Sequence, residues 1–132
     1  MLTIGYPQSV GDGLRHIFMN TDDIVVVGQA ANGEEALREL ESLSPDVVLT
    51  NIKMYMPGID GIELTRQITQ KYPSYKVIML TLYDEYLTQA LEAGAKGYLL
   101  MDIKSNELAQ AIRQVYGGQT VIGQGVKSKP QS

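Results

Sequence analysis

The chain has 132 residues and no cysteine, with 44% hydrophobic and 20% charged residues. This composition is typical of one globular domain that buries a core, and it excludes disulfides, thiolate metal sites and a catalytic cysteine. A formal net charge of −4 argues against nucleic-acid binding by this domain, because such surfaces are basic. We find no signal peptide and no apolar run near the roughly 20 residues of a membrane helix, so we expect a cytoplasmic protein without membrane contact.

Short apolar runs alternate with helix-like stretches along the whole chain. The runs expected to be strands are Leu2–Ile4, Ile24–Val27, Asp46–Thr50, Lys76–Thr81 and Lys96–Leu100. Strands and helices that alternate with short connections predict a parallel sheet covered by helices on both faces. Five such units predict an α/β, flavodoxin-like (βα)5 three-layer sandwich with strand order 2-1-3-4-5.

Polar residues and glycines indicate where the helices begin and end. The residues expected to cap helix starts are Asn32, Asp60, Asp84 and Ser105, and Glu35 and Glu63 complete capping boxes with the first two. Gly94 is expected to end the fourth helix. Residues 119–132 are rich in Gly, Gln, Lys and Ser, so we expect one folded domain over 1–118 and a linker or disordered tail over 119–132.

The stretch DVVLTNIKMYMPGIDG, from Asp46 to Gly61, is where we expect the functional site. A buried strand ends there at Asn51, and a loop containing Pro57 and Gly58 leads into the next helix. Open α/β sheets place their chemistry at the carboxyl ends of their strands. Asn51 therefore places an amide where a carboxylate would act as a nucleophile or a metal ligand.

Four segments then identify a family: PDVVLTNIKM…MPGIDGIEL, VIMLT, EAGAKGYLL and ELAQAIRQVYGGQT. In this order they resemble the receiver domain of bacterial two-component response regulators, in the NarL/FixJ or LuxR-like class with a helix-turn-helix output domain. The resemblance covers about residues 2 to 122 and implies a CheY-like fold and a place in a phosphorelay. In that family a sheet-end aspartate accepts a phosphoryl group. Two acidic residues help it hold Mg²⁺, and a lysine, a Ser/Thr and an aromatic residue respond to the phosphate.

Most of these positions are changed in this chain. The phosphoacceptor position is Asn51, and an amide cannot replace a carboxylate nucleophile. The acidic pair falls on Gly5 and Tyr6, neither of which offers Mg²⁺ a carboxylate. The lysine position is Met101. The resemblance therefore implies an inactive acceptor, with no metal, no Mg²⁺ binding and no other cofactor.

Two positions and one loop length need separate interpretations. The Ser/Thr and aromatic positions are retained as Thr81 and Tyr98, either as packed relics or as a switch that something other than phosphate sets. The loop from Lys53 to Pro57 is two residues longer than usual in the family and adds apolar bulk over the pocket. Asp12 is a recruited metal ligand or, as we favour, a solvated helix residue.

No arrangement of residues in the sequence indicates catalysis. His16 is the only histidine, and we expect it on the surface or at its boundary. There is no Ser-His-acid arrangement, no carboxylate pair in the pocket and no Gly-rich phosphate loop, so we expect no enzyme.

The leading hypothesis is an atypical receiver, or pseudo-receiver, that acts through protein contacts. Its expected partners are a second copy in a homodimer and a DNA-binding output domain in the full-length protein. The expected contact face covers about Asp84 to Tyr116, and the first helix with the fifth is the alternative. A second hypothesis is a sensor whose crevice binds a small apolar ligand in place of phosphate. The residues that would line it, or form an ordinary core edge, are Met54, Tyr55, Met56, Tyr83, Tyr86, Tyr98 and Met101.

Overall fold

The computed structural model of the chain describes residues 1–54 and 58–126. Its middle layer is a parallel sheet with the strand order β2-β1-β3-β4-β5-β6. The strands are β1 (Leu2–Ile4), β2 (Gly28–Ala30), β3 (Val47–Thr50), β4 (Lys76–Thr81), β5 (Gly97–Leu100) and β6 (Val121–Ile122). The flavodoxin-like, CheY-like fold is confirmed, with one strand more than the sequence predicted.

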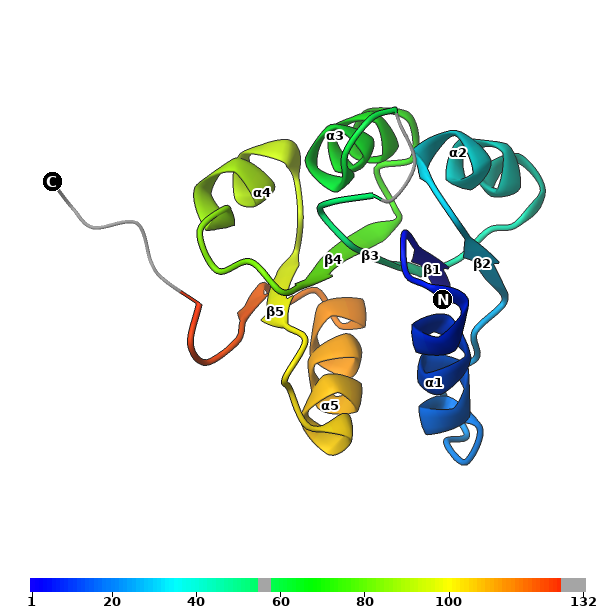
Figure 1. Ribbon diagram of the computed structural model, residues 1–132, viewed down its shortest axis with the longest axis vertical. Helices are drawn as coiled ribbons and strands as arrows, with labels where there is room; N and C mark the ends of the chain where they lie inside the picture. The colour runs from blue at the N-terminus through cyan, green and yellow to red at the C-terminus, as the bar shows by residue number, and fades with distance from the viewer. Residues whose placement is uncertain (55–57, 127–132) are drawn as a thin grey trace, which may run out of the picture.

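Five helices cover the two faces of this sheet. They are α1 (Gln8–Phe18), α2 (Gly33–Ser42), α3 (Gly61–Lys71), α4 (Leu87–Ala93) and α5 (Ser105–Tyr116). Figure 1 shows α1 and α5 on one face and α2, α3 and α4 on the other. No helix among residues 1–54 and 58–126 is long and apolar enough to cross a membrane.

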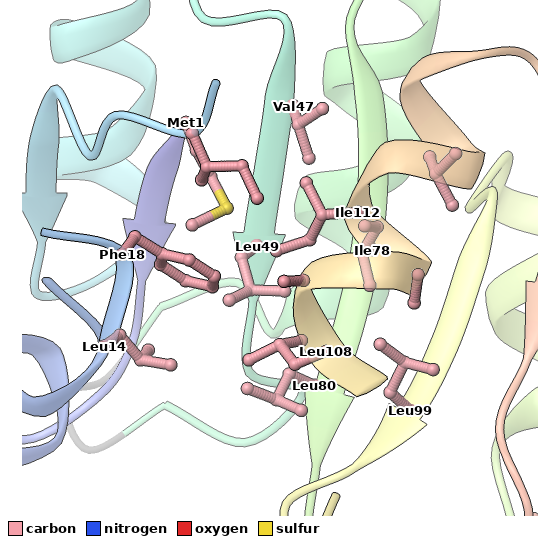
Figure 2. Close-up of a cluster of buried hydrophobic side chains, with 14 of the residues drawn as sticks. Met1, Leu14, Phe18, Val47, Leu49, Ile78, Leu80, Leu99, Leu108 and Ile112 are labelled. Carbon is pink, nitrogen blue, oxygen red and sulfur yellow. The ribbon is translucent and has the colours of Figure 1, made fainter. Parts of the chain in front are cut away.

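The core is divided by the sheet into clusters on its two faces. Figure 2 shows the cluster beneath α1 and α5, where Phe18 and Ile112 pack against Leu49 and Ile78. On the other face, α2 and α3 cover a second cluster and α4 covers a third. Residues Val77–Thr81 of β4 are all buried, as expected for a strand covered on both faces. This rigid centre holds the carboxyl ends of the strands in place.

Two predicted N-caps, at Asn32 and Asp60, and one predicted helix end are confirmed. The Glu35 N–H donates to Asn32 Oδ1 at 2.9 Å, and Glu35 Oε1 accepts from the Ala31 N–H at 3.0 Å. At the start of α3, the Glu63 N–H donates to Asp60 Oδ1 at 2.9 Å. The fourth helix ends at Gly94, which has a φ of 107°. This left-handed backbone favours glycine.

The caps predicted at Asp84 and Ser105 are wrong. The N-cap residue of α4 is Tyr86. Its N–H donates to the Tyr98 hydroxyl, and this bond fixes the end of the loop that precedes the helix. Ser105 is the first residue of α5 rather than its cap. The carbonyl of Lys104 already accepts the Leu108 N–H at 2.9 Å, which places the cap one residue earlier.

The second strand lies later in the chain than the apolar run predicted. The ladder between β1 and β2 begins where Leu2 pairs with Gly28, so Ile24–Val27 precedes it and does not form a strand. Two hydrogen bonds hold this run: the Val27 N–H donates to the Met1 carbonyl at 2.9 Å, and the Met1 amine donates to the Val25 carbonyl at 2.7 Å. The position of β2 in the chain is therefore set by its register with β1 and not by the β-branched composition of the preceding run.

The sheet also continues into the region predicted to be a linker or tail. Val121 and Ile122 pair with Gly97 and Tyr98 as β6. The Val121 N–H donates to the Lys96 carbonyl at 3.0 Å, so this segment satisfies backbone groups at the edge of β5. Within the predicted 119–132 tail, residues 119–126 therefore belong to the folded domain, and 127–132 lie outside the described residues.

Candidate functional site

The positions predicted from the sequence meet at the carboxyl ends of β1, β3, β4 and β5. Asn51 directly follows β3, and its N–H donates to the Ile4 carbonyl of β1 at 3.0 Å. Gly5 follows β1, Thr81 ends β4 and Met101 follows β5. The Met101 N–H donates to the Thr81 carbonyl at 2.9 Å, which connects the last two positions.

The side-chain amide of Asn51 binds the local backbone through both its nitrogen and its oxygen. Its Nδ2 donates to the Gly5 carbonyl at 3.2 Å, and its Oδ1 accepts from the Ile52 N–H at 2.9 Å. The reversed amide would place oxygen against oxygen and nitrogen against nitrogen, so this network determines its orientation. A carboxylate has no hydrogen to donate to the Gly5 carbonyl. The backbone around Asn51 therefore needs a side chain that both donates and accepts a hydrogen bond, as an amide does.

Met54 occupies the space that a side chain at Gly5 would need. Gly5 is the first of the two positions at which the resemblance expects an acidic residue. Gly5 has a φ of 82°, in the left-handed region. A Cβ added to Gly5 would clash with Met54 Sδ and come within 3.4 Å of Asn51 Cβ. An aspartate at Gly5 therefore needs both a strained backbone and a displaced Met54.

At the other two positions where the resemblance expects a charge, Tyr6 and Met101 place neutral side chains that pack against the core. The Tyr6 hydroxyl donates to the Leu80 carbonyl at 2.7 Å, and Tyr6 and Met101 both pack against the cluster beneath α1 and α5. Burial raises the pKa of Tyr6 well above its ordinary value, although its hydrogen bond to Leu80 acts in the opposite direction. Tyr6 is therefore a neutral donor, and the three positions 5, 6 and 101 carry no charge.

Thr81 and Tyr98 both bind the loop between β4 and α4. Thr81 Oγ1 accepts from the Tyr83 N–H at 3.2 Å. The Tyr98 hydroxyl donates to the Tyr83 carbonyl at 2.6 Å and accepts from the Tyr86 N–H at 3.3 Å. Both Thr81 and Tyr98 are completely buried, and burial is the main cause that raises the pKa of Tyr98 to about 12. Two protonated hydroxyls thus fix this loop from the core side.

Sequence reasoning missed a third contact of the same loop. Lys53, in the loop after β3, has its Nζ 5.2 Å from the ring centre of Tyr86 and 5.9 Å from that of Tyr83. The two rings meet edge to face, with centres 6.0 Å apart and planes at 73°. Only a structure could reveal this contact, because no sequence pattern pairs a lysine with two tyrosines some thirty positions away.

The remaining candidates form no metal site. Asp12 is exposed and accepts hydrogen bonds from Gln8 at 2.8 Å and Gln29 at 3.4 Å, and His16 is also exposed. Among residues 1–54 and 58–126, no three His, Cys, Asp or Glu side chains come together in a group that could hold a metal ion. The donor set at positions 5, 6 and 51 is a carbonyl, a phenol and an amide, which does not fit the preference of Mg²⁺ for carboxylates.

Three of the tyrosines and methionines predicted around the crevice pack against different parts of the core. Met101, Met54 and Tyr86 each pack against a different core cluster. Two cavities formed by the described residues, of about 630 and 930 Å³, lie elsewhere, and neither is lined by Asn51 or Met54. Tyr55 and Met56 lie outside the described residues.

Comparison with known proteins agrees with this geometry. A family model described as the response regulator receiver domain matches residues 8–113. The chain is 46% identical over 112 residues to the uncharacterized transcriptional regulatory protein YhcZ of Bacillus subtilis, covering 83% of this chain and 51% of that protein. It is 42% identical over 124 residues to the response regulator GacA of Pseudomonas viridiflava, covering 92% of this chain and 57% of that protein.

A solved structure gives the same result for the fold. The chain resembles a two-component response regulator of the LuxR family from Aurantimonas sp. SI85-9A1, with a TM-score of 0.87 and 28% identity. The match covers 95% of this chain and 89% of that one. By contrast, the chain spans only about half the length of the two relatives above. The chain belongs to the response regulator receiver domain family.

Proposed function

We propose that this receiver domain works without aspartyl phosphorylation and transmits its signal through protein contacts. The observation that carries the proposal is the set of contacts beside Asn51. The Asn51 amide is bound to the Gly5 carbonyl, and the Met54 thioether fills the space over Gly5. By the resemblance, these contacts lie at the positions with which the family binds its metal and phosphoryl group.

The chemistry of phosphoryl transfer supports the same proposal. Such a transfer requires a nucleophile and fixed positive charges that neutralise the transferred group. Here the nucleophile position is an amide, the metal positions are Gly5 and Tyr6, and the lysine position is Met101. Each change removes a different requirement, so restoring any single one is not expected to restore the reaction. The domain is accordingly proposed as a binding module and not as an enzyme, with no Mg²⁺ or other cofactor.

The proposed partners are a second copy of the chain and a DNA-binding output domain in a longer protein. Support for the output domain comes from the relatives, one of which is named a transcriptional regulatory protein and is about twice as long as the matched region. The proposed contact face is formed by α4, β5 and α5, where Leu91 is 36% exposed. Leu82, in the loop between β4 and α4, is 77% exposed. A homodimer through this face would be two-fold symmetric. The alternative is a face formed by α1 and α5.

The sensor hypothesis has no supporting observation at the crevice. An apolar ligand beside Asn51 would need the space that Met54 fills. Incubation with apolar metabolites should leave the melting temperature unchanged, whereas a ligand that bound the folded state would raise it.

Phosphorylation is tested directly by incubating the protein with acetyl phosphate and Mg²⁺ and measuring its intact mass. The expected result is an unchanged mass, with a receiver that keeps its aspartate as the positive control. A second sample carries Asn51→Asp alone, and it is also expected to remain unlabelled, because the metal and lysine positions are still neutral. Stoichiometric addition of a phosphoryl group to the unaltered chain would overturn the proposal.

A further inference from the structure

Two loops flank the crevice, and one cation bridges them. Lys53 belongs to the loop between β3 and α3, while Tyr83 and Tyr86 belong to the loop between β4 and α4. The Lys53 ammonium lies within 6 Å of both ring centres, at 5.2 Å from Tyr86 and 5.9 Å from Tyr83. The rings stand at 73° to one another, and the ammonium lies over both of them.

We propose that Tyr83 and Tyr86 form a cation site for an ammonium group, and that Lys53 fills this site to connect the two loops without phosphate. An ammonium is attracted to the negative face of an aromatic ring. We call the three residues the cation link. The Lys53 side chain is exposed, so its charge also keeps contact with water, and the attraction is of the modest size usual at surfaces.

The cation link completes a set of contacts that holds one loop from two sides. On the core side, Thr81 Oγ1 binds the Tyr83 N–H, and the Tyr98 hydroxyl binds the Tyr83 carbonyl and the Tyr86 N–H. On the outer side, Lys53 contacts the rings of the same two tyrosines. The loop is therefore fixed through both the backbone and the side chains of Tyr83 and Tyr86.

This inference rests on the proposed function, because it names what takes the place of phosphate between the loops. A phosphoryl group on the residue after β3 would connect that strand end to the hydroxyl of Thr81. In this chain Asn51 is bound to Gly5, and the connection across the crevice comes from Lys53 two residues later. Leu82 lies in the same loop between β4 and α4 and is 77% exposed. The position in which Leu82 meets a partner therefore depends on the cation link.

Hydrogen exchange of the Tyr83 and Tyr86 amides tests the cation link. Lys53→Met keeps the length of the side chain and removes its charge, and we expect these two amides to exchange roughly two- to fivefold faster. The matched control is Lys71→Met, because the Lys71 ammonium is exposed and lies 5.5 Å from the ring centre of Tyr72, away from this loop. Lys53→Arg retains a cation and should keep the original rates.

A double substitution separates the cation link from a general effect on stability. In a Tyr86→Leu background, Lys53→Met should accelerate the Tyr83 amide less than it does in the unaltered chain, because the nearer ring is already absent. The inference is overturned if Lys53→Met leaves the exchange of both amides unchanged, or if Lys71→Met accelerates them equally. Neither result would affect the conclusion on phosphorylation, which the mass measurement with acetyl phosphate decides separately.

Discussion

Asn51 Nδ2 donates a hydrogen bond of 3.2 Å to the carbonyl of Gly5, joining the ends of β3 and β1. This contact requires a donor, because the partner is a backbone oxygen. Asn51, the position that the resemblance assigns to the phosphoacceptor, is thus bound to the backbone of the scaffold. The first prediction follows from the loss of that donor.

Asn51→Asp should destabilise the domain by about 1–3 kcal/mol, because it removes the donor and places a carboxylate against the Gly5 carbonyl. The measurement is urea unfolding at neutral pH. Asn20→Asp makes the same chemical change at an exposed residue and should alter stability by no more than about 0.5 kcal/mol. A stabilised Asn51→Asp variant would show that the carbonyl of Gly5 does not need this donor.

Gly5→Ala should cost about 1–2 kcal/mol for its left-handed backbone, with a further cost from the clash with Met54. The two causes can be separated with Met54→Ala. In that background, Gly5→Ala should cost less, because the clash is removed and the backbone strain remains. Thermal or urea unfolding of the four proteins gives the coupling energy, and a coupling near zero would mean that Met54 moves away at no cost.

Tyr98→Phe should destabilise the domain by about 1–3 kcal/mol, since the carbonyl of Tyr83 loses its donor and the N–H of Tyr86 loses its acceptor. The exchange of the Tyr86 amide should also accelerate. Tyr116→Phe is the control, because this tyrosine is 61% exposed. If Tyr98→Phe were as stable as Tyr116→Phe, the hydroxyl of Tyr98 would be a relic without a structural role.

The comparison between sequence and structure shows which features depend on local signals. The N-caps at Asn32 and Asp60 and the apolar run of β4 were predicted, because each is decided by residues close together in the chain. The assignment of positions 5, 6 and 101 to charged residues of the family rests on the resemblance, and in this chain they are Gly, Tyr and Met. The place of these residues at the carboxyl ends of the strands could therefore be predicted before the structure.

The remaining features depend on contacts between distant segments. The run Ile24–Val27 has the composition of a strand, but the register of Leu2 with Gly28 places β2 after it. β6 is only two residues long and is stabilised by the free edge of β5. Met54 over Gly5 and Lys53 over Tyr86 join loops whose paths the sequence does not specify. Prediction failed where tertiary pairing decided the outcome.

Alkaline pH should destabilise the domain through its buried tyrosines. Burial raises the pKa of Tyr98 from 10.0 to about 12 and that of Tyr6 well above its ordinary value. A tyrosine with a raised pKa in the folded state keeps its proton longer when folded than when unfolded. Its stabilising contribution is therefore complete below pH 10 and is lost as the pH rises from 10 towards 12.

Urea unfolding from about pH 9 to about pH 11.5 measures this dependence, and the free energy of unfolding should fall across the range. Tyr98→Phe should start from a lower stability and fall less steeply, because one of the two buried phenols no longer titrates. Tyr116→Phe, altered at an exposed side chain, should keep the slope of the unaltered protein. Equal slopes for all three proteins would mean that Tyr98 ionises as readily in the folded state as in the unfolded one, and would contradict its buried hydrogen bond to Tyr83.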